Sequence, residues 1–93
     1  MIERAGGRLL VAAPMVMTNA RALLAAGGAA LAPGEQVFDL ARVAEAASSA
    51  IAVMLGWLRA AGPARSTLLF PNIPAGVLAL AELYGINELL PRA

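Results

Sequence analysis

The stretch that decides the fold is residues 36–61, QVFDLARVAEAASSAIAVMLGWLRAA. It opens with a short, largely apolar run at residues 36–40, bounded by loop residues, which indicates a central β-strand. After a short loop, residues 50–61 contain no proline and a single glycine, and two serines just before them can cap a helix. A Gly-Pro pair follows and is expected to end this helix. The sequence therefore predicts a strand that leads through a short loop into the main helix of the protein.

The predicted helix has two faces of different character. The residues expected to face the core lie at positions i, i+3, i+4 and i+7: Ile51, Met54, Leu55 and Leu58. The opposite face is predicted to point outward and comprises Ser49, Ala52, Val53, Gly56, Arg59 and Ala60. Small residues recur every four positions on this outward face, and small side chains let another backbone approach closely. We therefore predict a partner-binding surface that also includes Ser48; the alternative is that alanines fill exposed positions without any partner.

Glycine and proline divide the rest of the chain into further elements. We expect strands at residues 8–13, 15–17 and 66–70, and helices at 20–26, ended by Gly27-Gly28, at 74–84, ended by Gly85, and at 88–90 as one short turn. The order is strand, strand, helix, strand, helix, strand, helix. The predicted fold class is therefore α/β, a single domain over residues 1–93 with a small mixed sheet of about four strands covered by three to four helices. Crossovers through helices would make much of this sheet parallel.

The composition excludes two broad classes of protein. The chain has 93 residues, of which 60% are hydrophobic and only 14% charged, with a formal net charge of +1. This balance lacks the strong basic field of a nucleic-acid-binding protein. A disordered polar chain is excluded as well, because such chains combine low hydrophobicity with high net charge. Some of the apolar surface must stay exposed on so small a chain, and exposed apolar patches usually bind a partner.

The chemistry-bearing residues argue against an enzyme. The chain has no cysteine and no histidine, which removes thiol chemistry, cysteine-ligated zinc and any Ser-His-Asp triad. The acids are scattered and are expected to be solvated: Glu3, Glu35, Asp39, Glu45, Glu82 and Glu88. We therefore expect no catalytic residue, metal, cofactor or small-molecule ligand. The longest uncharged stretch, residues 66–81, is too short and too interrupted by proline to span a membrane, and no secretory signal is recognisable, so a cytoplasmic location is expected.

Two parts of the chain resemble a known family. Residues 37–43, an apolar strand ending in Asp-Leu, followed by Ala46–Leu55 at the start of the helix, are similar to the signature of STAS domains, the sulphate-transporter and anti-sigma-factor-antagonist modules. The resemblance places Ser48 on the family's regulatory Ser/Thr position and Ser49 on the small residue after it. The acid that usually precedes the regulatory position is Ala47 here.

The C-terminal half narrows the resemblance. Residues 68–74 (LLFPNIP), 78–86 (LALAELYGI) and 88–91 (ELLP) resemble the small stand-alone STAS subunit of bacterial phospholipid ABC transporters, which maintain the lipid asymmetry of the outer membrane. This resemblance implies a non-catalytic accessory subunit that binds the cytoplasmic ATPase of such a transporter at the inner membrane, without inserting into it. The alternative is an anti-sigma-factor antagonist that switches partners through phosphorylation at Ser48.

Overall fold

The structure is a computed structural model that describes residues 1–92, so Ala93, the last residue of the expected 1–93 domain, lies outside the described residues. The elements in chain order are β1 (Ile2–Ala5), β2 (Arg8–Val11), α1 (Met17–Ala29), β3 (Gly34–Asp39), α2 (Ser48–Ala64), β4 (Ser66–Leu69), α3 (Ala75–Leu83) and the short 3-10 helix η1 (Asn87–Leu89). The predicted α/β class and the order β-β-α-β-α-β-α are confirmed.

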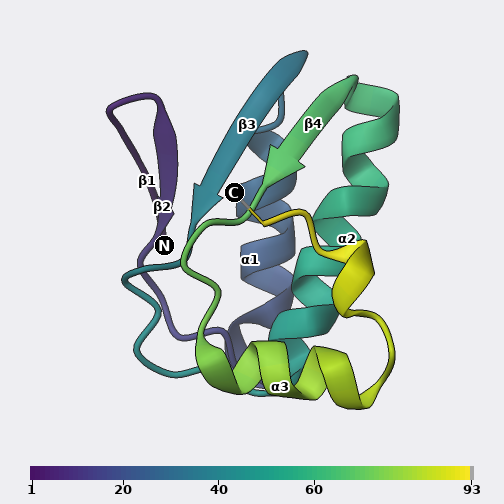
Figure 1. The fold of residues 1–93 in the computed structure, drawn as a ribbon. Helices are drawn as coiled ribbons and strands as arrows, with labels where there is room; N and C mark the ends of the chain where they lie inside the picture. Colours follow the sequence, from purple (N-terminus) through teal and green to yellow (C-terminus); the bar gives the residue numbers. More distant parts are fainter. Residues whose placement is uncertain (93) are drawn as a thin grey trace.

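The strands form one mixed sheet in the order β1-β2-β3-β4. β1 and β2 are antiparallel, whereas β2, β3 and β4 are parallel to one another, as the helical crossovers predict. Figure 1 shows α1 and α2 packed on one face of the sheet, and α3 lying across the end toward which β3 and β4 point. The loops that enter the three α-helices therefore gather at the carboxyl ends of the parallel strands.

The N-terminal strands differ from the prediction. The structure has a hairpin of Ile2–Ala5 and Arg8–Val11, and the Gly6-Gly7 turn between them takes φ values of +56° and +78°. Two consecutive positive φ angles are the geometry of a tight two-residue hairpin turn, which glycine permits without steric cost. The predicted strand at residues 15–17 is wrong, because only Met15 forms an isolated bridge, with Ala46, and α1 already begins at Met17.

The core is organised around three aromatic rings from three different elements. Trp57 of α2 lies with its ring centroid 4.7 Å from that of Phe38 on β3 and 6.3 Å from that of Phe70, directly after β4. All three side chains are fully buried. The indole Nε1–H of Trp57 donates a hydrogen bond of 3.0 Å to the backbone carbonyl of Leu23 in α1. Trp57 thus joins the sheet to both helices on its covered face, with its polar atom satisfied.

Helix α1 extends beyond its predicted end because a glycine is needed inside it. The prediction ended this helix at Gly27-Gly28, but α1 continues to Ala29. A Cβ atom at Gly27 would overlap the indole of Trp57, whereas a Cβ at Gly28 would meet no other atom within 4 Å. Gly27 is therefore an internal contact position that lets α2 approach α1, and it is not a helix terminator.

The side of α2 that is buried in the structure differs from the predicted side by a rotation of about one residue, or roughly 100° around the helix axis. The residues that α2 buries are Ala50, Ile51, Val53, Met54, Trp57 and Ala61, whereas Leu55 and Leu58 are only half-buried. Val53 is therefore a core residue with 1% of its surface exposed, and its assignment to the partner-binding surface was wrong. The physical reason is that Trp57, the largest apolar side chain of the chain, faces the core. Val53 lies four positions before Trp57, on the same side of the helix, and is therefore buried as well.

We predict that Gly27→Ala lowers the free energy of unfolding by about 1–2 kcal/mol, because the added methyl group overpacks the indole of Trp57 by more than alanine gains in helix propensity. Gly28→Ala is the matched control in the same helix and is expected to leave stability unchanged or to raise it by up to about 1 kcal/mol. Urea unfolding followed by circular dichroism measures both. Equal stabilities for the two variants would contradict the account.

Candidate functional site

The start of α2 is attached to the start of α1 by backbone hydrogen bonds. The amide of Met15 donates to the carbonyl of Glu45 at 2.8 Å, and the amide of Ala47 donates to the carbonyl of Met15 at 3.1 Å. The hydroxyl of Ser49 lies 3.5 Å from the same carbonyl, at the long limit of a hydrogen bond. The two loops that enter these helices are therefore held side by side, which places the first turns of α1 and α2 on one surface.

The two serines occupy different environments. The N-cap of α2 is Ala47, in an extended conformation and without a side-chain cap, so the prediction that Ser48 or Ser49 caps the helix was wrong. Ser48 is the first helical residue and is exposed, whereas Ser49 is half-buried beside Met15. Within residues 1–92, the Ser48 hydroxyl makes no hydrogen bond to another protein group. Of the two hydroxyls, that of Ser48 is the one accessible to another molecule.

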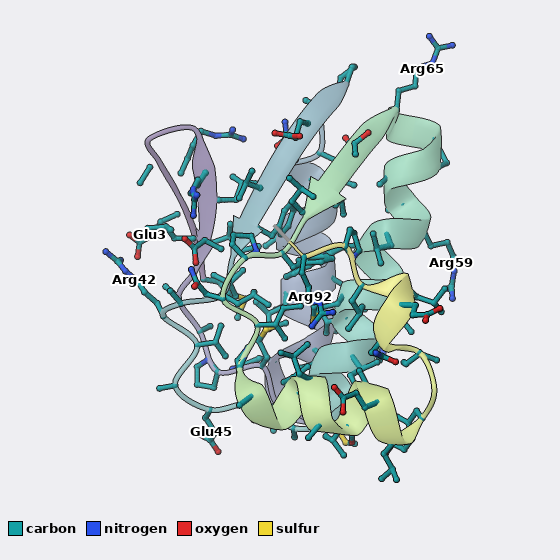
Figure 2. The ribbon with its side chains drawn as sticks, viewed as in Figure 1. Glu3, Arg42, Glu45, Arg59, Arg65 and Arg92 are labelled. Atoms are coloured by element: carbon teal, nitrogen blue, oxygen red, sulfur yellow. The ribbon has the colours of Figure 1, made fainter. Side chains whose placement is uncertain are left out.

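Most of the predicted partner-binding residues lie together on the outer side of α2. Ser48, Ala52, Arg59 and Ala60 are exposed and Ser49 is half-buried; we call these five residues the α2 face. Figure 2 shows Arg59 pointing away from the body of the molecule. The α2 face carries one charged residue over about three turns of helix, and its other side chains are small: two serines and two alanines.

Gly56, at the centre of the predicted surface, is already in contact with this chain. A Cβ atom at Gly56 would overlap Cδ2 of Leu24 in α1, so the missing side chain is replaced by Leu24. The half-buried Gly56 is thus a helix-packing position, and the prediction that it is free for a partner was wrong. The spacing of small residues could not distinguish contact with α1 from contact with another protein, because both need the same absence of a side chain.

A polar cluster around Asp39 holds the neighbouring loops. Asp39 is the last residue of β3 and has 7% of its surface exposed. Its carboxylate accepts hydrogen bonds from Arg8 Nη1 at 2.9 Å, from Asn72 Nδ2 at 3.0 Å and from the amide of Ala41 at 2.9 Å. Asn72, with φ +62°, belongs to the loop between β4 and α3. Asp39 therefore joins the loop that leads to α2 with the loop that leads to α3.

These contacts lower the pKa of Asp39. The hydrogen bond from Asn72 is the largest cause, and the Ala41 amide and the Arg8 guanidinium act in the same direction, whereas burial opposes them. Asp39 was predicted to be a solvated surface acid, which is wrong because it is buried and fully hydrogen-bonded. Asp39 was already part of the family signature, but its partners Arg8 and Asn72 lie more than thirty positions away in the sequence, and only the fold brings them together.

Pockets, metal-ligand clusters and long apolar helices are all absent from the described part of the chain. Residues 1–92 contain no pocket and no cluster of three or more groups able to hold a metal ion. None of the helices in this range combines the length and the apolar character that a bilayer-spanning helix requires.

Comparisons with known proteins identify the family. A family model described as "Mlab, STAS domain" matches residues 2–91, and the chain therefore belongs to the STAS domain family. Among solved structures, an anti-sigma-factor antagonist (STAS) domain protein from Planctomyces limnophilus is similar, with a TM-score of 0.67 and 18% sequence identity over 99% of this chain and 86% of that chain. At this identity the likeness establishes the fold alone. No curated protein matches the chain.

We predict that Asp39→Asn lowers the free energy of unfolding at pH 7 by about 1–3 kcal/mol, because the variant loses a charge-assisted hydrogen bond to Arg8. Since the pKa of Asp39 is lower in the folded chain than its ordinary value of about 3.9, its contribution is fully present above about pH 4 and is lost as the pH falls through the folded-state pKa. The variant should therefore lose less stability than the wild type between pH 5 and about pH 3.

Urea unfolding at several pH values tests this expectation. Glu35→Gln is the matched control, because it removes the same charge from an exposed carboxylate on the same strand. The control should keep the pH dependence of the wild type. If Asp39→Asn and the wild type lose stability in parallel on acidification, the role assigned to Asp39 is incorrect.

Proposed function

We propose that this STAS domain is a non-catalytic accessory subunit of a bacterial phospholipid ABC transporter. It binds the cytoplasmic ATPase through the α2 face and stabilises or regulates the assembly at the inner membrane. The observation that carries the proposal is the α2 face itself, where Ser48, Ala52, Arg59 and Ala60 are exposed together on one helix.

The character of the α2 face favours a lasting protein partner. A solvated helix face normally carries several charges, but this one has Arg59 alone. Interface centres are likewise poor in charged residues. Small side chains at Ala52 and Ala60 allow a partner backbone to come close without displacing side chains of this chain. These properties suit a subunit that remains bound better than a domain that is free in solution.

The choice of a transporter ATPase rests on two further supports. The first is the similarity of the C-terminal half to stand-alone STAS subunits of phospholipid transporters, noted above for residues 68–91. The second is the description of the matching family model, which reads "Mlab, STAS domain". These two similarities support the choice of a transporter ATPase as the partner.

We predict that Ala52→Arg and Ser48→Glu each abolish co-purification with the transporter ATPase, because a long or charged side chain prevents close approach at the α2 face. Ala79→Arg is the matched control, since Ala79 is an exposed alanine on α3 and receives the same new side chain. Affinity capture of the tagged subunit, followed by measurement of the bound ATPase, gives the result. Undiminished capture by both α2 variants would rule out this surface as the binding site.

A second candidate function is an anti-sigma-factor antagonist that is switched by phosphorylation. The observation in its favour is Ser48, whose hydroxyl is exposed and whose position in the first turn of α2 suits a negative group. A phosphate there would add about −1.5 to −2 charges to a surface that lacks acids, and it would block docking of a partner.

Incubation of the purified chain with a partner-switching serine kinase distinguishes this candidate. It predicts one added phosphate on the wild type and on Ser49→Ala, and none on Ser48→Ala, as measured by intact-protein mass spectrometry. A wild-type chain that remains unmodified by the kinase would exclude phosphorylation at Ser48 as its switch.

A further inference from the structure

The surface beside the α2 face continues onto α1. Met17, the first residue of α1, has 82% of its surface exposed, and Leu24, which covers Gly56, has 38% exposed. Both are large apolar side chains, and they are separated by seven positions, which places them on the same side of α1. The bonds between the entry loops of the two helices place Met17 close to the start of α2. The apolar surface is therefore formed by two helices.

The charges on these two helices have one sign. α1 and α2 together contain two ionisable side chains, Arg21 and Arg59, and no acid. Both arginines are exposed, and neither forms an ion pair within residues 1–92. Arg21 lies between Met17 and Leu24 on α1, whereas Arg59 lies on the outer side of α2. The apolar surface thus has an unpaired guanidinium group on each of its helices.

The relative position of the two arginines follows from the packing of the helices. α1 and α2 run in the same direction, and Leu24 lies level with Gly56, so Arg21 is level with Val53. Arg59 is six residues further along α2, which is about 9 Å at 1.5 Å per residue. The two arginines are thus offset by about 9 Å along the helix axes and stand on neighbouring helices whose axes are about 8–10 Å apart. Their long side chains can pair with carboxylates about two turns apart on a helix that lies obliquely across α1 and α2.

We propose that the segment of the partner seated on α1 and α2 is an acidic amphipathic helix. Its apolar side contacts Met17, Leu24 and Ala52, and two acidic residues about seven positions apart pair with Arg21 and Arg59. This inference deepens the proposed function, on which it rests, by giving the chemistry of the partner at the same site. Charge complementarity with Arg21 and Arg59 favours this occupant, because complementary charges mainly determine the choice of partner and the rate of association.

The same charges argue against a second copy of this chain as the occupant. A symmetric dimer through this surface would bring the arginines of two copies together without any acid on either helix to compensate them. Self-association through this face is therefore unfavourable.

The probe is a pair of synthetic peptides of about 20 residues with the same alanine- and leucine-rich face. One carries glutamate at two positions seven apart, and the other carries lysine at the same positions. We expect the wild-type chain to bind the glutamate peptide about tenfold more tightly than the lysine peptide. Shifts of the backbone NMR signals should be centred on Met17, Leu24 and Ala52. The double variant Arg21→Glu/Arg59→Glu should reverse the preference.

The matched control is Arg4→Glu/Arg92→Glu, which changes the net charge by the same amount at two exposed arginines outside α1 and α2 that form no ion pair within residues 1–92. This control should keep the preference of the wild type. The inference is overturned if the glutamate peptide does not bind, if both peptides bind equally, or if the charge reversal leaves the preference unchanged. Binding of wild-type chain to phosphatidylglycerol vesicles that is lost in Arg21→Glu/Arg59→Glu would identify a membrane surface as the occupant and would also overturn it.

Capture of the transporter ATPase separates this inference from the proposed function. If the wild-type chain does not capture the ATPase, the proposed function fails, and the peptide experiment still decides the chemistry of the surface. If both the wild type and Arg21→Glu/Arg59→Glu capture the ATPase equally, the acidic-helix inference fails and the proposed function remains.

Discussion

The contact between Trp57 and α1 is the constraint on which the rest of the structure depends. The indole of Trp57 lies against Gly27 and donates its N–H to the carbonyl of Leu23, while Phe38 and Phe70 enclose the ring from the side of the sheet. Burial of a tryptophan side chain of roughly 150–250 Å² corresponds to about 4–6 kcal/mol of hydrophobic free energy. On a chain of 93 residues with one modest core, a single side chain that joins the sheet to both α1 and α2 supplies a large part of that core.

The same contact determines which residues reach the surface. With Trp57 directed inward, Val53 and Met54 fall into the core and Gly56 lies against Leu24. The α2 face is then composed of outward positions that, apart from Arg59, carry serine or alanine. A rotation of α2 by about one residue toward the predicted core side would bury Leu55 and Leu58 and expose Val53. The proposed docking surface is therefore a consequence of how the core is packed.

The fold class could be predicted from the sequence, but the side of α2 that faces the core could not. Strand and helix order could be predicted because glycine and proline divide the chain clearly and the helical runs are long. The buried side of α2 could not be predicted, because on an alanine-rich helix either Leu55 or Trp57 can belong to the apolar stripe that faces the core. The Ile2–Ala5 strand was missed because it has only four residues and two adjacent ones, Glu3 and Arg4, are charged, so it shows no apolar alternation. The Asp39 cluster depends on contacts between distant residues, for which local patterns give no signal.

The most direct test of the account is the hydrogen exchange of the Trp57 indole N–H, which gives a single resonance because the chain has one tryptophan. If this group is buried and bonded to Leu23 as described, it should exchange only when the whole domain unfolds. The free energy of exchange should then equal the free energy of global unfolding measured in urea. Exchange that is faster than global unfolding by several orders of magnitude would contradict the account, because α2 would then be free to turn and its outer face would be undefined.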